Sequence, residues 1–142
     1  MNYSSHLQGA LQQYKKIGAQ TDVATASPHR LIQMLLEGAL EKINLAKGYM
    51  QRNEIQLKGN HISWAISIID GLRISLDKDT GGDIADNLDA LYDYMGRRLA
   101  EANLANDTAM LDEVSGLLLE IKAAWDQVPG SLGDQESTEK AE

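Results

Sequence analysis

The stretch ASPHRLIQMLLEGAL occupies residues 26–40 and opens with a helix-start signal. Ser27 can accept a hydrogen bond from a free backbone N–H as an N-cap, and Pro28 suits the first helical position. The apolar residues that follow are more numerous than one core-facing stripe requires. The stretch therefore predicts a long helix that is apolar on more than one side.

On either side of this stretch, the chain is predicted to be helical almost throughout. Apolar residues recur at spacings of three and four, and no segment alternates with period two for long enough to be a strand. We expect five helices, a short one and four long ones, at about residues 3–17, 28–51, 54–76, 83–104 and 107–127.

Long helices of similar length with short connections pack antiparallel to their neighbours. The predicted fold class is therefore all-α, an antiparallel up-down-up-down four-helix bundle with an additional short N-terminal helix. Residues 1–26 are assigned to the N-terminal amphipathic helix and its linker, 27–128 to the bundle, and 129–142 to an acidic tail. The tail is predicted to be disordered because it has almost no apolar side chains.

The second long helix carries apolar and small residues outside its expected core stripe. Ile62, Ile66 and Ile69 are expected to face the core, whereas Trp64 and Ile68 are expected to point away from it. An exposed apolar surface usually marks an interaction site, and amphipathic helical segments commonly dock on such surfaces. The alternatives are a wide core, or docking of the protein's own N-terminal helix. The candidate partner-binding residues are Trp64, Ile68, Gly71, Leu72, Ser75 and, on the third long helix, Tyr94.

Composition excludes several classes of function. The net charge of −8 argues against nucleic-acid binding, and the absence of cysteine excludes disulfides and thiolate metal sites. No segment approaches the roughly 20 apolar residues that span a bilayer, and the N-terminus lacks a signal peptide, so we expect a cytoplasmic protein without membrane insertion. None of the three histidines follows a glutamate in the Glu-x-x-His pattern of di-iron bundles, and His29 is expected to be exposed. No phosphate-binding or nucleophile motif is present, so we expect neither a cofactor nor catalysis.

The order and spacing of several segments resemble the flagellar secretion chaperones. They are ASPHRLIQMLLEGAL, AxxIIDGL at 65–72, SLDKDTGGDIADNLDALYDYM at 75–95, AN at 102–103, EV at 113–114 and AAW at 123–125. The resemblance runs from about Tyr3 to Val128. It departs from the family at Leu36, where many members have an aromatic residue, and at Asp83, where glutamate is common.

The resemblance implies a non-enzymatic export chaperone. Such proteins bind the disordered C-terminal segment of flagellin, prevent its premature polymerisation and assist its delivery to the flagellar type III export apparatus. The export gate and flagellar regulatory proteins are further expected partners, and the free protein is expected to be a monomer or a weak homodimer. The alternative function is a regulatory binding protein that sequesters another flagellar factor, such as an anti-sigma factor or an assembly factor.

The N-terminal helix is expected to cover part of the binding surface. Leu7, Leu11 and Tyr14 are spaced to dock on an apolar surface, and residues 18–26 form a linker of small and polar residues. In the family that this chain resembles, the corresponding segment packs on the bundle.

Overall fold

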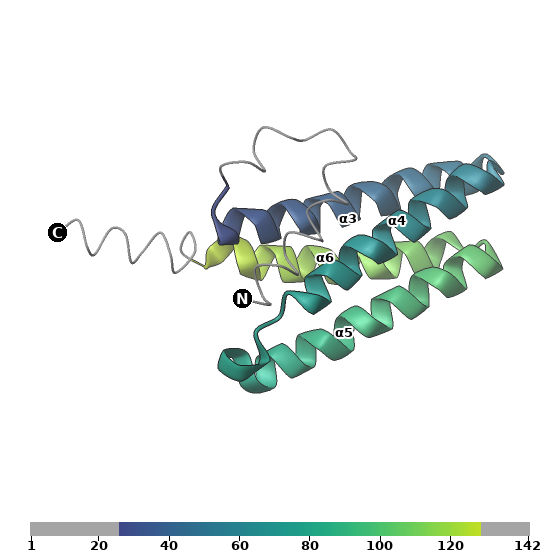
Figure 1. Ribbon diagram of the computed structural model, residues 1–142. Coiled ribbons are helices and arrows are strands. Elements are labelled where there is room, and N and C mark those ends of the chain that lie inside the picture. Colours follow the sequence, from purple (N-terminus) through teal and green to yellow (C-terminus); the bar gives the residue numbers. More distant parts are fainter. Residues whose placement is uncertain (1–25, 129–142) are drawn as a thin grey trace.

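The computed structural model describes residues 26–128, and these form helices without any strand. The predicted N-terminal helix, its linker up to residue 25 and the acidic tail lie outside the described residues. The all-α prediction is confirmed for the described part of the chain (Figure 1). Its four helices are α3 (Pro28–Gln51), α4 (Ile55–Ile74), α5 (Lys78–Ala105) and α6 (Thr108–Gln127).

Side-chain caps start α3, α6 and, as described below, α5. Ser27 accepts a hydrogen bond from the Arg30 backbone N–H at 3.2 Å, and Pro28 follows at the first helical position, as predicted. Asp107 accepts from the Ala109 N–H at 2.9 Å and begins α6. Each cap satisfies a backbone donor that has no partner inside its helix.

The start of α5 differs from the prediction of a helix beginning at Asp83. Asp77 caps an earlier turn by accepting from the Thr80 N–H at 3.1 Å. The helix is then interrupted at Gly82, whose φ of 53° and ψ of −128° are not helical. Ile84, which follows the interruption, is 72% exposed rather than part of the core.

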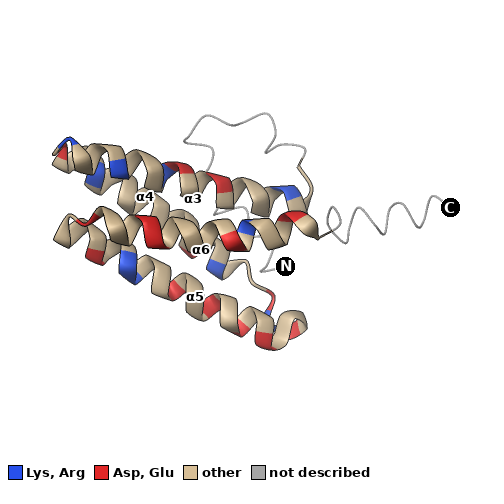
Figure 2. Cartoon of the chain, turned by 180° about the vertical axis from the view of Figure 1, so that it is seen from behind, with Lys and Arg blue, Asp and Glu red and all other residues tan. Residues whose placement is uncertain are grey.

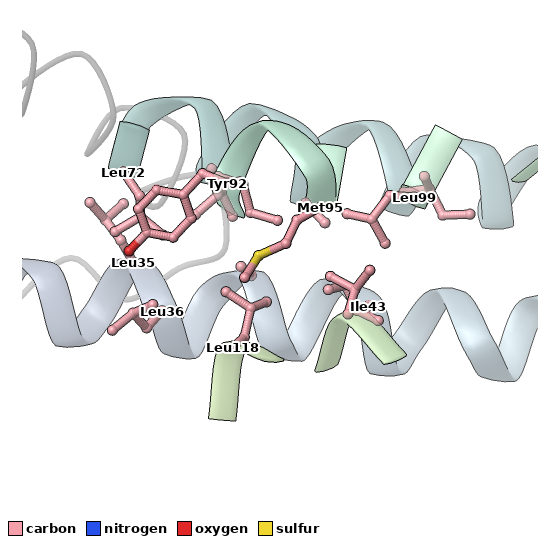
Figure 3. Packing of buried hydrophobic residues seen from close by; sticks show 14 of the residues in the cluster. Leu35, Leu36, Ile43, Leu72, Tyr92, Met95, Leu99 and Leu118 are labelled. Carbon is pink, nitrogen blue, oxygen red and sulfur yellow. The ribbon is translucent and has the colours of Figure 1, made fainter. Parts of the chain in front are cut away.

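Each helix packs against two others. The contacting pairs are α3 with α4, α4 with α5, α5 with α6, and α3 with α6. Successive helices run in opposite directions, and the four enclose one buried apolar cluster (Figure 1). Figure 3 shows side chains of α5 pointing towards those of α3. The labelled residues of this cluster are Leu35, Leu36 and Ile43 of α3, Leu72 of α4, Tyr92, Met95 and Leu99 of α5, and Leu118 of α6.

Ion pairs link neighbouring helices at the surface. Arg73 of α4 contacts Asp89 of α5 at 2.6 Å, and Lys47 of α3 contacts Asp112 of α6 at 2.8 Å. Acidic side chains are spread along α5 and α6 (Figure 2). Exposed pairs of this kind contribute little free energy individually, so the apolar core carries most of the stability.

Candidate functional site

The α3–α4 face contains a buried lysine next to a tryptophan. Lys42 of α3 is only 4% exposed, and its ammonium lies 4.0 Å from the centre of the Trp64 ring of α4. Burial lowers the pKa of Lys42, and the nearby charge of Glu41 opposes this effect. The electron-rich face of the ring attracts the cation and offsets part of the lost hydration.

Further rings continue from Trp64 along the same two helices. The His61 ring lies between Trp64 and Tyr49, with centres 6.0 Å and 4.9 Å away. The Arg52 guanidinium lies 5.2 Å from the Tyr49 ring. The result is a cation–aromatic row, which we define as Lys42, Trp64, His61, Tyr49 and Arg52. Lys42 and Tyr49 belong to α3, Trp64 and His61 belong to α4, and Arg52 directly follows α3, so the row spans the contact between these two helices.

The residues predicted next to Trp64 are buried in this structure. Ile68 is 0% exposed and Leu72 is 2% exposed, and both belong to the core cluster. Gly71 is buried as well, and the buried Ser75 hydroxyl donates to the Leu72 carbonyl at 2.8 Å. The prediction that Ile68 points to an exposed surface is therefore wrong.

The physical reason is that Ile68 adjoins the core stripe of α4 instead of lying opposite it. With an advance of about 100° per residue, Ile68 lies only about 40° from Leu72 around the helix. A residue so close to the core stripe is buried wherever packing covers the edge of that stripe. Trp64, further round the helix, is half-buried and packs against the core cluster.

Tyr94 lies away from the other predicted site residues. Its hydroxyl donates to the Glu113 carboxylate of α6, and Arg98 of α5 also contacts Glu113, at 2.7 Å. The hydrogen bond to Glu113 is the main cause of the raised pKa of Tyr94. The structure therefore places Tyr94 at the α5–α6 interface, whereas Trp64 contacts α3. Leu7, Leu11 and Tyr14, the predicted cover residues, lie outside the described residues.

Comparison with known proteins then identifies the family. Residues 10–131 match the family model described as flagellar protein FliS. The chain belongs to the FliS family. The matched residues include Leu11 and Tyr14 and all four helices of the structure.

The FliS relatives have similar lengths to this chain. It is 52% identical over 119 residues to the flagellar secretion chaperone FliSB of Pseudomonas aeruginosa, an alignment that covers 84% of this chain and 94% of the relative. It is 46% identical over 123 residues to the flagellar secretion chaperone FliS of Vibrio cholerae, covering 87% and 90%. With the Salmonella typhimurium FliS it shares 44% identity over 128 residues, covering 89% and 95%.

This FliS-family chain also buries a histidine, His29, that was expected to be exposed. His29 is 6% exposed, and its ring stacks on Trp125 of α6 with centres 4.8 Å apart and planes 13° apart. The Trp125 indole N–H donates to the His29 carbonyl at 3.0 Å. The prediction failed because the covering residue lies 96 positions away in the chain, where helical periodicity gives no information.

Lys58 is a second buried cation of this FliS-family chain, and it has a structural role. Its ammonium donates to the Asn103 carbonyl and to the Asn106 side-chain oxygen, both at 3.0 Å, at the C-terminal end of α5. A cation is stabilised there by free carbonyls and by the helix dipole. Two of the three N–H donors of the Lys58 ammonium thus have oxygen acceptors, in contrast to Lys42.

Within residues 26–128, no cluster of three or more His, Asp or Glu side chains is arranged to hold a metal ion. No helix in that same range is long and apolar enough to cross a membrane.

Proposed function

We propose that this chain is a cytoplasmic export chaperone that binds the disordered C-terminal segment of flagellin. Binding would prevent premature polymerisation and assist delivery to the flagellar type III export apparatus. The observation that carries the proposal is the family membership, together with the names of relatives that align over most of the chain as flagellar secretion chaperones. The proposed role requires neither catalysis nor a cofactor. The export gate and flagellar regulatory proteins would be further partners.

The proposed binding surface is the α3–α4 face around Trp64. Trp64 would contact flagellin with its half-buried ring, and Ile68, Gly71, Leu72 and Ser75 would extend the surface along α4. Because Ile68 and Leu72 belong to the buried core cluster, flagellin would reach them only by displacing what packs over that edge of α4. Tyr94 would contribute a separate contact at the α5–α6 interface, through its ring rather than its hydroxyl, which already donates to Glu113.

We infer that the cover is the chain's own N-terminus. Residues 3–17 would form a short additional helix that docks Leu7, Leu11 and Tyr14 on the α3–α4 face, while the four long helices form an antiparallel up-down-up-down bundle. The spacing of Leu7, Leu11 and Tyr14 and the small and polar residues of the 18–26 linker support the inference. In solution the free protein would be a monomer or a weak homodimer.

Titration calorimetry tests the proposed function. A flagellin C-terminal segment should bind the full chain at one to one, and burial of apolar surface should give a negative heat-capacity change across several temperatures. Absence of heat at every temperature, together with a pull-down that recovers an anti-sigma or assembly factor and no flagellin, would contradict the proposal and favour the regulatory alternative.

A further inference from the structure

The unusual feature of the α3–α4 face is that a buried cation lies there without an anion. Lys42 is 4% exposed, and among residues 26–128 no carboxylate oxygen lies within ion-pair distance of its ammonium. Its chain neighbour Glu41 is exposed, and adjacent residues of a helix point in directions about 100° apart. Buried charges in proteins are normally paired, because removal from water is costly.

The Trp64 ring supplies only part of the lost hydration of Lys42. A cation–π contact is attractive but gives the N–H groups of the ammonium no oxygen acceptor. Lys58 shows the contrast within the same chain, because its ammonium has two oxygen acceptors at 3.0 Å. Lys42 therefore retains unused capacity to donate hydrogen bonds.

The surroundings of Lys42 favour an anionic partner. The cation–aromatic row contains two cationic side chains, and only one of them has a carboxylate partner, because Arg52 pairs with Glu54 at 2.7 Å and Lys42 pairs with none in the described part of the chain. An approaching carboxylate would thus meet the Lys42 ammonium as the cation of the row that is not already paired with a carboxylate. The same ligand would be repelled by the many acidic side chains of α5 and α6 (Figure 2).

The proposed N-terminal cover cannot supply this anion. Residues 1–17 contain no Asp or Glu, and they carry Lys15 and Lys16. A flagellin segment that presents a carboxylate would therefore make a contact with Lys42 that the cover cannot make. This difference would favour exchange of the cover for flagellin.

We propose that Lys42 and Trp64 form a subsite for the side-chain carboxylate of an Asp or Glu in the bound flagellin segment. The carboxylate accepts a hydrogen bond from the Lys42 ammonium, which remains on the Trp64 ring, while apolar neighbours of the acidic residue pack on the same face. A charge-assisted bond of this kind in a water-poor site is stronger than a neutral one. The subsite rests on the proposed function, because it assigns a specific contact within the flagellin site.

A double-mutant cycle tests the subsite. The full chain and its Lys42→Met variant are titrated with a flagellin C-terminal segment and with versions in which each Asp or Glu is changed singly to Asn or Gln. One amide version should bind the unmodified chaperone about tenfold more weakly, equivalent to about 1.4 kcal/mol. Lys42→Met should bind the original segment about tenfold more weakly and should not distinguish that amide version.

Controls separate this effect from misfolding and from general electrostatics. Lys47→Met removes a lysine of the same helix that already pairs with Asp112, and it should leave flagellin affinity within about threefold of the unmodified value, the size of a surface contribution. Thermal unfolding checks that Lys42→Met is folded, and Lys42→Gln takes its place in the same cycle if it is not. A segment with an amidated C-terminus should bind normally, because the proposal assigns a side-chain carboxylate.

The subsite is contradicted if Lys42→Met binds as tightly as the unmodified chain, or if every amide version weakens both proteins equally. It is also contradicted if only C-terminal amidation abolishes the difference between the two proteins. In each case flagellin binding itself stands. If the unmodified chain binds no flagellin segment, the proposed function fails first and the subsite fails with it.

Discussion

At the scale of single residues, Tyr92 places an ionisable phenol in the apolar core. It is 4% exposed, and burial raises its pKa to about 12. In the unfolded chain the phenol ionises near pH 10, about two units lower. Between these values the unfolded state has lost its proton and the folded state has not, so the free energy of unfolding falls as pH rises.

This difference gives a pH-dependent prediction for Tyr92→Phe. Full stability should be present below pH 10, and by about pH 12 the unmodified protein should lose roughly 3 kcal/mol through Tyr92, at 1.36 kcal/mol per unit. Tyr92→Phe should lack this increment, so its urea-unfolding free energy should fall less steeply above pH 10. If the unfolding free energies of the two proteins fall equally steeply above pH 10, Tyr92 is not the source of the pH dependence.

Trp64 is expected to matter more for binding than for folding. Its ring is half-buried and carries the Lys42 ammonium, so Trp64→Ala should weaken flagellin binding by about thirtyfold, or roughly 2 kcal/mol. Ile62→Ala, in the core of the same helix at 1% exposed, is the matched control. It should cost roughly 2–5 kcal/mol of stability while the folded fraction keeps its affinity. Equal affinity losses in the two variants would argue against a specific role of Trp64.

Local chemistry made some residues predictable and left others unpredictable. Ser27 and Pro28 were predicted correctly as a helix start because an N-cap depends on the next three residues. The burial of His29 and Lys42 depends on Trp125 and Trp64, which reach them from other helices. Ile68 was wrongly predicted to be exposed because it lies at the edge of the core stripe of α4, where a small rotation of the helix decides burial.

At the scale of elements, α5 is divided by Gly82. Its φ of 53° is a conformation that glycine adopts readily and residues with a Cβ rarely adopt. The turn at 78–81 precedes this interruption, and the long regular part of α5 follows it. Periodicity correctly located the long part of α5, but the preceding turn depends on the Asp77 cap and carries little apolar signal.

Two glycine-to-alanine variants should change stability in opposite directions. Gly82→Ala and Gly116→Ala would each place a Cβ in open space, with nothing within 4 Å. They differ in backbone conformation, because Gly116 is helical and Gly82 is not. Gly82→Ala should therefore cost about 1–3 kcal/mol through strain, whereas Gly116→Ala should gain about 0.5–1 kcal/mol in helix propensity.

Thermal or urea unfolding of both variants checks this contrast. If Gly82→Ala is as stable as the unmodified chain, the interruption of α5 at that residue is not present in solution.

At the scale of the whole molecule, the N-terminal segment is proposed to compete with flagellin. A tethered segment lowers the apparent affinity of a competing ligand by the fraction of time that it leaves the site open. Deleting residues 1–17 should therefore speed flagellin association in stopped-flow measurements. An unchanged or slower association rate in the shortened, still folded chain would contradict the cover and would instead place the segment within the flagellin site.

The acidic tail should not contribute to this competition. Four of its residues are acidic and almost none are apolar, so it has little surface with which to offset the entropy of ordering. A chain ending at Gly130 should keep its thermal midpoint and its flagellin affinity in the same titration. A tenfold loss of affinity would show that the tail takes part in binding.

The most direct measurement concerns the claim that flagellin binds at the face bearing Trp64. The chain has two tryptophans, so Trp125→Phe leaves Trp64 as the only indole reporter, and Trp64→Phe leaves Trp125. Trp125 lies near the C-terminal end of α6, where its N–H donates to the His29 carbonyl. A flagellin C-terminal segment without tryptophan is titrated into each variant while emission is recorded. The Trp64 reporter should shift its emission and saturate at one to one, and the Trp125 reporter should stay nearly constant. Binding by calorimetry with an unchanged Trp64 emission, or a shift at Trp125 alone, would contradict the proposed site.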